Sequence, residues 1–330
     1  MSDAKTLRIT VATKDYDHVR DFQNGVVTAS GVEAVWLTLP IEEVFHRFFS
    51  HLEFDVSEVS MAKYVSAMAR GDSPYVGIPV FPARVFRHSS FWVRADSGFS
   101  SPAELAGKRI GVPEWAQTAG VYMRGVLSGE YGVELNGITW YQGGVNMAGR
   151  KEHARLALPA DIDLTVVTDR SLNDMMLAGE LDAVLSARPP AASKRGDGRV
   201  RRLFSDPEAV ERASRQSTGI MPIMHTIAIR RELVDRHPWL PASLYGAFDA
   251  AKARSQSRLR DVDGPNAPLP WIGYETERAD AESGGDPWPY GVEANRATLS
   301  AFLKWSYEQG VCERLLTPDE LFVFNGDGAG

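Results

Sequence analysis

The chain has 330 residues, of which 44% are apolar and 24% are charged, and its formal net charge is −7 at neutral pH. This length supports two lobes with a sizeable core, and the composition is typical of a soluble globular protein. The excess of acidic residues argues against a nucleic-acid partner, because phosphate binding needs clustered Lys and Arg. No apolar run is long enough to cross a membrane.

The cysteine count and the N-terminus bear on the compartment. Cys312 is the one cysteine, so neither an intrachain disulfide nor a thiolate zinc cage can form. A strand-like run begins at Leu7 without the apolar segment and cleavage site of a secretory signal. We therefore expect a cytoplasmic protein, and the sequence predicts no metal ligands.

The first part of the chain alternates predicted strands and helices. Apolar and polar residues alternate from Leu7 to Thr13 and again near Val32 to Leu37, which predicts two strands. Helical spacing of apolar residues begins at Ile41. A short strand and turn at Phe54 to Ser60 and a helix at Met61 to Met68 complete a pattern that indicates a parallel α/β layer.

A stretch from Pro79 to Val93 combines cationic and strongly apolar residues. Arg84, Arg87 and His88 lie between prolines on one side and aromatic and β-branched residues on the other. In a strand, Arg84 and His88 share one face and Arg87 lies on the opposite face. We expect these cations to face a buried anionic ligand, and the alternation leaves open whether Arg84 or Arg87 points inward.

The middle of the chain predicts a second α/β layer. Ser101 and Pro102 have the residue types of a helix N-cap and first turn. A strand at Lys108 to Val112 leads through a turn into a helix that begins near Thr118, and the free N–H groups of such a helix start attract carboxylates. Further strands are expected at Ile138 to Tyr141, Leu164 to Val167, Leu181 to Leu185 and Arg202 to Phe204.

The last third contains one apolar strand and several helices. Gly219 to Ile229 predicts a buried strand, in which Pro222 suits either a sheet edge or a crossing between lobes. Helices are expected at Arg231 to Arg236, Pro241 to Arg258 and Ala294 to Gln309. The apolar face of the last helix is expected to hold Leu299, Phe302, Leu303 and Tyr307.

Common catalytic motifs of metalloproteases, serine hydrolases and nucleotide-binding proteins are missing, so no nucleotide cofactor is expected. What remains is a set of polar and cationic residues near predicted strand ends, where ligands bind in an open parallel sheet. The proton-transfer candidates are His225, His88 and His18. The candidates for substrate binding are Arg20, Arg84, Arg87, Trp115, Thr118, Arg124, Arg188, Asp286 and Tyr290.

Each candidate also has an ordinary structural interpretation. An arginine can pair with a nearby acid, an aromatic ring can pack in the core, and Asp286 can cap a turn. His225 lies in the most apolar stretch of the second half. A core histidine with hydrogen-bonded ring nitrogens is as consistent with this position as a catalytic histidine.

Several segments resemble known families. Residues 101–115 (SPAELAGKRIGVPEW) and 178–184 (AGELDAV) resemble the second lobe of type II periplasmic-binding-protein folds. Residues 79–89 (PVFPARVFRHS), 222–226 (PIMHT) and 288–296 (WPYGVEANR) together resemble the 4,5-dihydroxyphthalate decarboxylase family, and this likeness covers nearly the whole chain.

The resemblance implies two α/β lobes, each a mostly parallel sheet flanked by helices, with a ligand cleft between them. Lobe 1 is expected at residues 1–95 and 221–330, and lobe 2 at 96–220. The implied reaction is a non-oxidative, cofactor-independent loss of one carboxylate from 4,5-dihydroxyphthalate, which gives 3,4-dihydroxybenzoate and carbon dioxide.

Two alternatives share this fold. One is a binding protein that holds an aromatic or other small carboxylate without chemistry, since fold does not fix function. The other is a decarboxylase for a different hydroxylated aromatic acid. The histidines near the expected cleft favour an enzyme, and a homo-oligomer is compatible with the composition.

Overall fold

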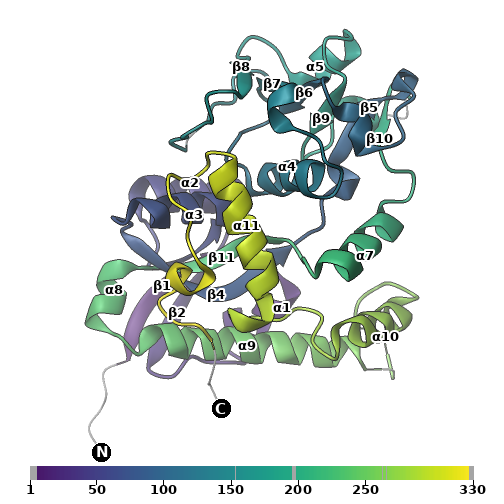
Figure 1. The fold of residues 1–330 in the computed structure, drawn as a ribbon. Coiled ribbons are helices and arrows are strands. Elements are labelled where there is room, and N and C mark those ends of the chain that lie inside the picture. The colour runs from purple at the N-terminus through teal and green to yellow at the C-terminus, as the bar shows by residue number, and fades with distance from the viewer. Residues whose placement is uncertain (1–5, 153, 195–197, 262, 265, 327–330) are drawn as a thin grey trace, which may run out of the picture.

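The strands form two sheets that lie in two separate bodies of the molecule (Figure 1). The structure is a computed structural model that describes residues 6–152, 154–194, 198–261, 263–264 and 266–326. The first sheet has the order β2-β1-β3-β11-β4, with β1 at Leu7–Thr13, β2 at Val32–Thr38, β3 at Val56–Ser60, β4 at Tyr75–Arg84 and β11 at Ile223–Arg230. The second has the order β10-β5-β9-β6-β7-β8, with β5 at Phe91–Arg94, β6 at Arg109–Val112, β7 at Thr139–Gln142, β8 at Asp163–Val166, β9 at Ala183–Leu185 and β10 at Val200–Arg202.

Both sheets are mixed. In the first sheet β1 is parallel to β2 and β3, whereas β11 is antiparallel to its neighbours β3 and β4. In the second sheet β9, β6, β7 and β8 are parallel and β5 is antiparallel to β9 and β10. The carboxyl ends of β1 and β3 and the start of β11 therefore meet at one edge of the first sheet.

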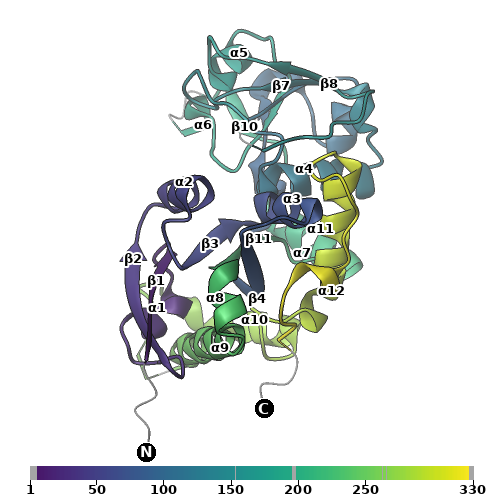
Figure 2. The same cartoon turned by 90° about the vertical axis from the view of Figure 1, so that its left-hand side faces the viewer.

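Helices cover the sheets, and some of them lie where the two bodies meet. Helix α9 runs beneath the first sheet, and α2 and α3 lie on the side of the first body that faces the second (Figure 2). The helices are α1 (Asp17–Gln23), α2 (Ile41–His51), α3 (Met61–Arg70), α4 (Thr118–Gly129), α5 (Leu172–Leu177), α6 (Ala191–Lys194), α7 (Pro207–Thr218), α8 (Arg231–Arg236), α9 (Leu240–Leu259), α10 (Ile272–Ser283), α11 (Arg296–Glu308) and α12 (Pro318–Leu321). Short 3₁₀ turns lie at His88–Ser90, Ala95–Ser97, Pro102–Leu105, Leu135–Gly137 and Glu293–Asn295.

Helix α11 packs closely against α4 of the second body (Figure 1). A Cβ atom on Gly125 would lie 2.3 Å from the ring of Trp305, so only glycine allows this approach of the two helices. The rings of Tyr122 and Phe302 stack with their centroids 4.8 Å apart. This interface joins the two bodies along one side.

The chain crosses from the first sheet to the second between Arg84, where β4 ends, and Phe91, where β5 begins. Strand β5 pairs with β9 and β10 of the second sheet, although the expected boundary at 95 places it in lobe 1. We therefore propose that lobe 1 ends near Arg84. The return crossing lies between α7 and β11, and it contains Pro222, a residue that was expected to suit a crossing.

The structure corrects several expected elements. The stretch from Pro79 is not one continuous strand, because the backbone leaves the first sheet after Arg84 and forms a 3₁₀ turn at His88–Ser90. The strand expected at Arg202 to Phe204 lies at Val200–Arg202. Tyr307 is 47% exposed and lies off the apolar face of α11. Helix α10 was not expected.

Candidate active site

Polar side chains gather where the strands of the first sheet end. His225 of β11 is opposite Ser60 of β3, and Ile227 is opposite Glu58. Since side chains alternate along a strand, Glu58, Ser60 and His225 share one face of the sheet. Further along the same face the side chains of Val56, Ile227 and Ile229 are apolar and buried, so the polar group rests on an apolar wall.

Glu58 is the centre of this group, and its side chain is fully buried. The Nδ1 atom of His225 lies 2.6 Å from Glu58 Oε1, and the hydroxyl of Tyr16 donates to the same oxygen at 2.7 Å. The backbone N–H of Lys14 donates to Oε2 at 3.0 Å. Burial, reinforced by the nearby Glu58 carboxylate, raises the pKa of Tyr16 well above its usual range, so its hydroxyl stays a donor.

His225 is held in one tautomer by this carboxylate. Because Glu58 accepts, the proton that faces it lies on Nδ1, and Nε2 is left for another partner. The imidazole packs edge-on against Phe45 with ring centroids 5.0 Å apart, and its side chain is 19% exposed. Among the described residues no hydrogen-bond partner is found for Nε2, which can therefore exchange a proton with a ligand.

A cleft cavity of about 710 Å³ lies between the two bodies. Lys14 and Glu42 line it from the first body, and Gln117, Arg150 and Arg188 line it from the second. Lys14 connects the cavity to the site, since its backbone N–H binds Glu58. A neighbouring cavity of about 570 Å³ is lined by Phe45, the residue that packs against His225, and shares Glu42 and Arg150 with the first.

Thr118 joins the two bodies beside this site. Its hydroxyl lies 3.0 Å from the hydroxyl of Ser60 and accepts from the backbone N–H of Ala62 at 3.0 Å. Thr118 is the first residue of α4, so the start of this helix is held against the end of β3. The expected helix start therefore lies at the same strand end as His225.

Comparisons with known proteins show the family of the chain. The chain is 39% identical over 317 residues to a 4,5-dihydroxyphthalate decarboxylase of Comamonas testosteroni, and the match covers 96% of each chain. It belongs to the 4,5-dihydroxyphthalate decarboxylase family. A 4,5-dihydroxyphthalate decarboxylase of Pseudomonas putida is also 39% identical over 203 residues, which cover 61% of this chain and 79% of that protein. No protein-family model matches the chain.

Solved structures show the fold of this decarboxylase-family chain. The periplasmic aliphatic sulphonate binding protein SsuA from Escherichia coli aligns with a TM-score of 0.53 and 13% identity, over 99% of this chain and 94% of that one. A putative periplasmic sulfonate-binding protein from Methylobacillus flagellatus aligns with a TM-score of 0.52 and 12% identity, over 96% and 91% of the two chains. The expected two-lobed type II periplasmic-binding-protein fold is confirmed.

Arg188 is the one predicted arginine that lines the described cleft cavity, where it lies 3.1 Å from Glu42. Arg84 is buried, and its guanidinium donates to the carbonyl oxygens of Met221 and Pro289 and to the side chain of Asn295. Burial lowers the pKa of Arg84 to about 10. These contacts hold the two crossings together and leave only its Nε without a partner.

The remaining predicted arginines lie outside the cleft cavity. Arg87 is partly buried beside β11, where its Nε lies 3.3 Å from the sulfur of Met224, and burial lowers its pKa to about 10. Arg20 is exposed on α1 and pairs with Asp17. Arg124 is fully buried over the ring of Trp115 and donates to Gln309 of the loop after α11 at 2.8 Å.

The other two histidines differ from His225. His88 is buried, its ring nitrogens lack a hydrogen-bond partner among the described residues, and Nε2 lies 3.9 Å from Glu130. His18 donates through Nε2 to the carbonyl oxygen of Pro82 at 3.1 Å. Burial lowers the pKa of His18 to about 4, so this ring is neutral at neutral pH.

The pH dependence of stability tests this burial. The unfolded chain binds a proton at His18 below pH 6.5, whereas the folded chain binds it only near pH 4, so the folded state loses stability as the pH falls from about 6.5 to about 4. The loss is on the order of 3 kcal/mol. In His18→Gln, whose amide can still donate to Pro82, we expect the free energy of unfolding, measured in urea, to fall less between pH 7 and pH 4.5 than in the unmodified protein. An equal fall in both proteins would show that burial of His18 does not cause the loss.

The predicted aromatic and acidic ligands take part in internal contacts. Trp115 is fully buried, and its indole N–H donates to the carbonyl oxygen of Gln309 at 2.7 Å. Asp286 accepts from Lys252, Gln256 and the backbone of Trp288. Burial alone would raise the pKa of Asp286, but these hydrogen bonds lower it overall. Tyr290 is buried, and its hydroxyl has no partner among the described residues.

Sequence reasoning missed Glu58, which binds His225, and Tyr16, which binds Glu58. It also missed the polar cleft residues Glu42, Gln117 and Arg150. One signal was present, because Glu58 is two positions from Val56 in a short predicted strand and therefore shares its buried face. A carboxylate in such a position requires a partner.

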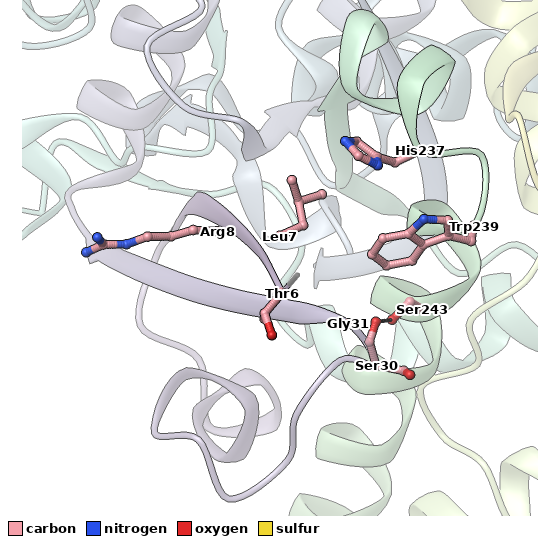
Figure 3. A pocket seen from close by; sticks show the side chains of 8 residues that line it. All are labelled: Thr6, Leu7, Arg8, Ser30, Gly31, His237, Trp239 and Ser243. Carbon is pink, nitrogen blue, oxygen red and sulfur yellow. Dashed lines mark hydrogen bonds between the residues drawn. The ribbon is translucent and has the colours of Figure 1, made fainter. Parts of the chain in front are cut away.

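A separate cavity of about 840 Å³ lies at the opposite end of β1, between the strand and the start of α9 (Figure 3). Trp239 and His237 form one wall and Arg8 points away from them. Its charged groups do not converge, and it lies outside the site at Glu58.

No helix among the described residues is long and apolar enough to span a bilayer. No cluster of three potential metal ligands was found within the described ranges.

Proposed function

We propose that the protein removes one carboxylate from 4,5-dihydroxyphthalate and releases carbon dioxide and 3,4-dihydroxybenzoate. The observation that carries the proposal is the pair of His225 and Glu58 beside the cleft, in a chain that belongs to this decarboxylase family. One nitrogen of His225 is fixed by a buried carboxylate and the other is left for a ligand, which is the arrangement of a proton-transfer group.

The aromatic ring can supply the electrons for this reaction. The hydroxyl para to the departing carboxylate donates electron density, and protonated His225 gives its Nε2 proton to the ring carbon that bears the carboxylate. The bond between that carbon and the carboxylate then breaks, and its electron pair restores the aromatic ring. His225 ends neutral and regains a proton from water.

Glu58 and Tyr16 act on His225 rather than on the substrate. The Glu58 carboxylate, 2.6 Å from Nδ1, stabilises the positive charge of the protonated imidazole and fixes the direction of Nε2. Tyr16 donates to the same oxygen and keeps the carboxylate in place. Phe45 and the apolar wall exclude water from one side of the ring, which strengthens these electrostatic contacts.

The decisive experiment is incubation with 4,5-dihydroxyphthalate while the ultraviolet spectrum and the release of carbon dioxide are followed. We expect saturable conversion to 3,4-dihydroxybenzoate. Saturable binding without spectral change would favour a binding protein, the alternative suggested by the fold it shares with sulfonate-binding proteins. Absence of binding would indicate another hydroxylated aromatic acid as the substrate.

We also propose a reducing compartment, the cytoplasm, for this activity. The one cysteine cannot form an intrachain disulfide, and burial raises the pKa of the Cys312 thiol to about 11, so it is poorly reactive. A homo-oligomer stays a prediction of the sequence.

A further inference from the structure

Glu42 spans the mouth of the cleft between two arginines of the second body. Its Oε1 lies 3.1 Å from Nη2 of Arg188 and 3.6 Å from Nη1 of Arg150. Glu42 belongs to the first turn of α2 in the first body, so one carboxylate oxygen from one side of the cleft meets two guanidinium groups from the other. All three residues line the cleft cavity.

The second body holds the side chain of Arg150 and the loop that carries Arg188. Glu114, whose side chain is almost fully buried, accepts from Nε and Nη2 of Arg150 at 2.7 and 2.6 Å, and this leaves Nη1 directed at Glu42. The side chain of Asn146 fixes the loop that carries Arg188, because it donates to the carbonyl oxygen of Pro189 at 3.1 Å and accepts from the N–H of Ala191 at 2.7 Å. The backbone N–H of Arg188 donates to Ser186 Oγ at 3.1 Å, and its guanidinium binds Glu42. Arg150 is therefore held at the cleft without Glu42, and the position of the Arg188 backbone is fixed by its loop.

The charge of the cavity is suited to an anion. Its ionisable lining consists of Lys14, Arg150 and Arg188 with the carboxylate of Glu42, and the buried Glu114 behind Arg150 balances a second cation, which leaves one positive charge in excess. Gln117 also lines the cavity, and its buried Oε1 has no hydrogen-bond donor among the described residues. A hydroxylated aromatic dicarboxylate supplies both complementary groups, carboxylates for the cations and a phenolic O–H for Gln117.

Glu42 is easily displaced from this position. The side chains of Glu42 and Arg188 are 61% and 60% exposed, and solvent-exposed ion pairs contribute little stability. A substrate carboxylate can bind the two guanidinium groups through both oxygens, which is a stronger arrangement than a single shared oxygen. The released Glu42 stays in the first turn of α2, where the helix dipole favours a negative charge.

We infer that Arg150 and Arg188 form the subsite for the carboxylate that the substrate retains, and that Glu42 occupies this subsite while the cleft is empty. The inference rests on the proposed decarboxylase function for the identity of the substrate, but not for the presence of a carboxylate subsite. It predicts that Glu42 and the substrate compete for the same two cations.

The test measures binding of phthalate by calorimetry, because phthalate has both carboxylates but lacks the hydroxyl needed for decarboxylation. In Glu42→Gln we expect phthalate to bind about two- to tenfold more tightly, since the competing charge is gone. In Arg188→Ala we expect binding about tenfold weaker. In the double variant the gain from Glu42→Gln should shrink, because one of its two partners is missing.

Glu43→Gln is the matched control, since Glu43 is the neighbouring exposed acid of α2 and pairs with Arg47 instead. Its phthalate affinity should equal that of the unmodified protein. If Glu42→Gln leaves the affinity unchanged or weakens it, Glu42 does not compete with the ligand and the inference fails. Decarboxylation of 4,5-dihydroxyphthalate is assayed separately, so an inactive protein whose phthalate affinity follows these expectations would refute the proposed function alone.

Discussion

Replacement of His225 by alanine lowers the turnover number for 4,5-dihydroxyphthalate by at least about a hundredfold, the usual scale for loss of a general acid or base. The variant lacks the group that carries a proton to the ring carbon, and a water molecule in its place is a far weaker acid than a protonated imidazole. Steady-state kinetics, followed through the ultraviolet spectrum, give the turnover number and KM separately.

The control for this result is His51→Ala, which removes an exposed histidine from the end of α2. It should leave turnover within about twofold, as expected for a surface change away from the site. Thermal unfolding shows whether His225→Ala still folds. A well-folded His225→Ala protein with near-normal turnover would reduce His225 to a hydrogen-bonded core residue.

Replacement of Glu58 by glutamine is expected to lower turnover by about a hundredfold while KM changes little. The side chain keeps its size but loses the charge that stabilises protonated His225, and its amide can donate to Nδ1 and select the wrong tautomer. Glu58 does not line the described cleft cavities, which is why binding should persist. The measurement is turnover and KM for 4,5-dihydroxyphthalate, together with urea unfolding.

Glu33→Gln provides the comparison, because Glu33 is an exposed acid of β2 that pairs with Arg8 far from the site. A loss of stability can be separated from a loss of turnover, because the unfolding curve gives the folded fraction and the turnover number is calculated for folded protein alone. Turnover of Glu58→Gln within about twofold of the unmodified protein would contradict the role of Glu58.

The sequence predicted most strands and helices because their signals are local. Apolar spacing located the helix at α2, Ser101 and Pro102 located a 3₁₀ start, and the apolar run after Pro222 located β11. The stretch from Pro79 was misread after Arg84, because its composition suits a strand but the backbone there crosses between sheets. Composition does not show where a chain leaves a sheet.

The site was less predictable because its contacts join distant segments. His225 was a candidate from its own surroundings, whereas its bond to Glu58 spans 167 positions and depends on the register of β11 against β3. The arginines show the same limit. Arg84 binds backbone carbonyls, whereas Arg188 lines the cleft cavity. Both lie at or just after the end of a strand, so their places in the sequence do not distinguish these two roles.

The packing of α4 against α11 has a mechanical consequence. Trp305 fills the space left by Gly125, and Arg124 reaches Gln309, so the two bodies are fixed to each other along this side. The opposite side is joined at Glu42 by exposed ion pairs. We therefore expect the cleft to open at Glu42, while the packed helices α4 and α11 stay together.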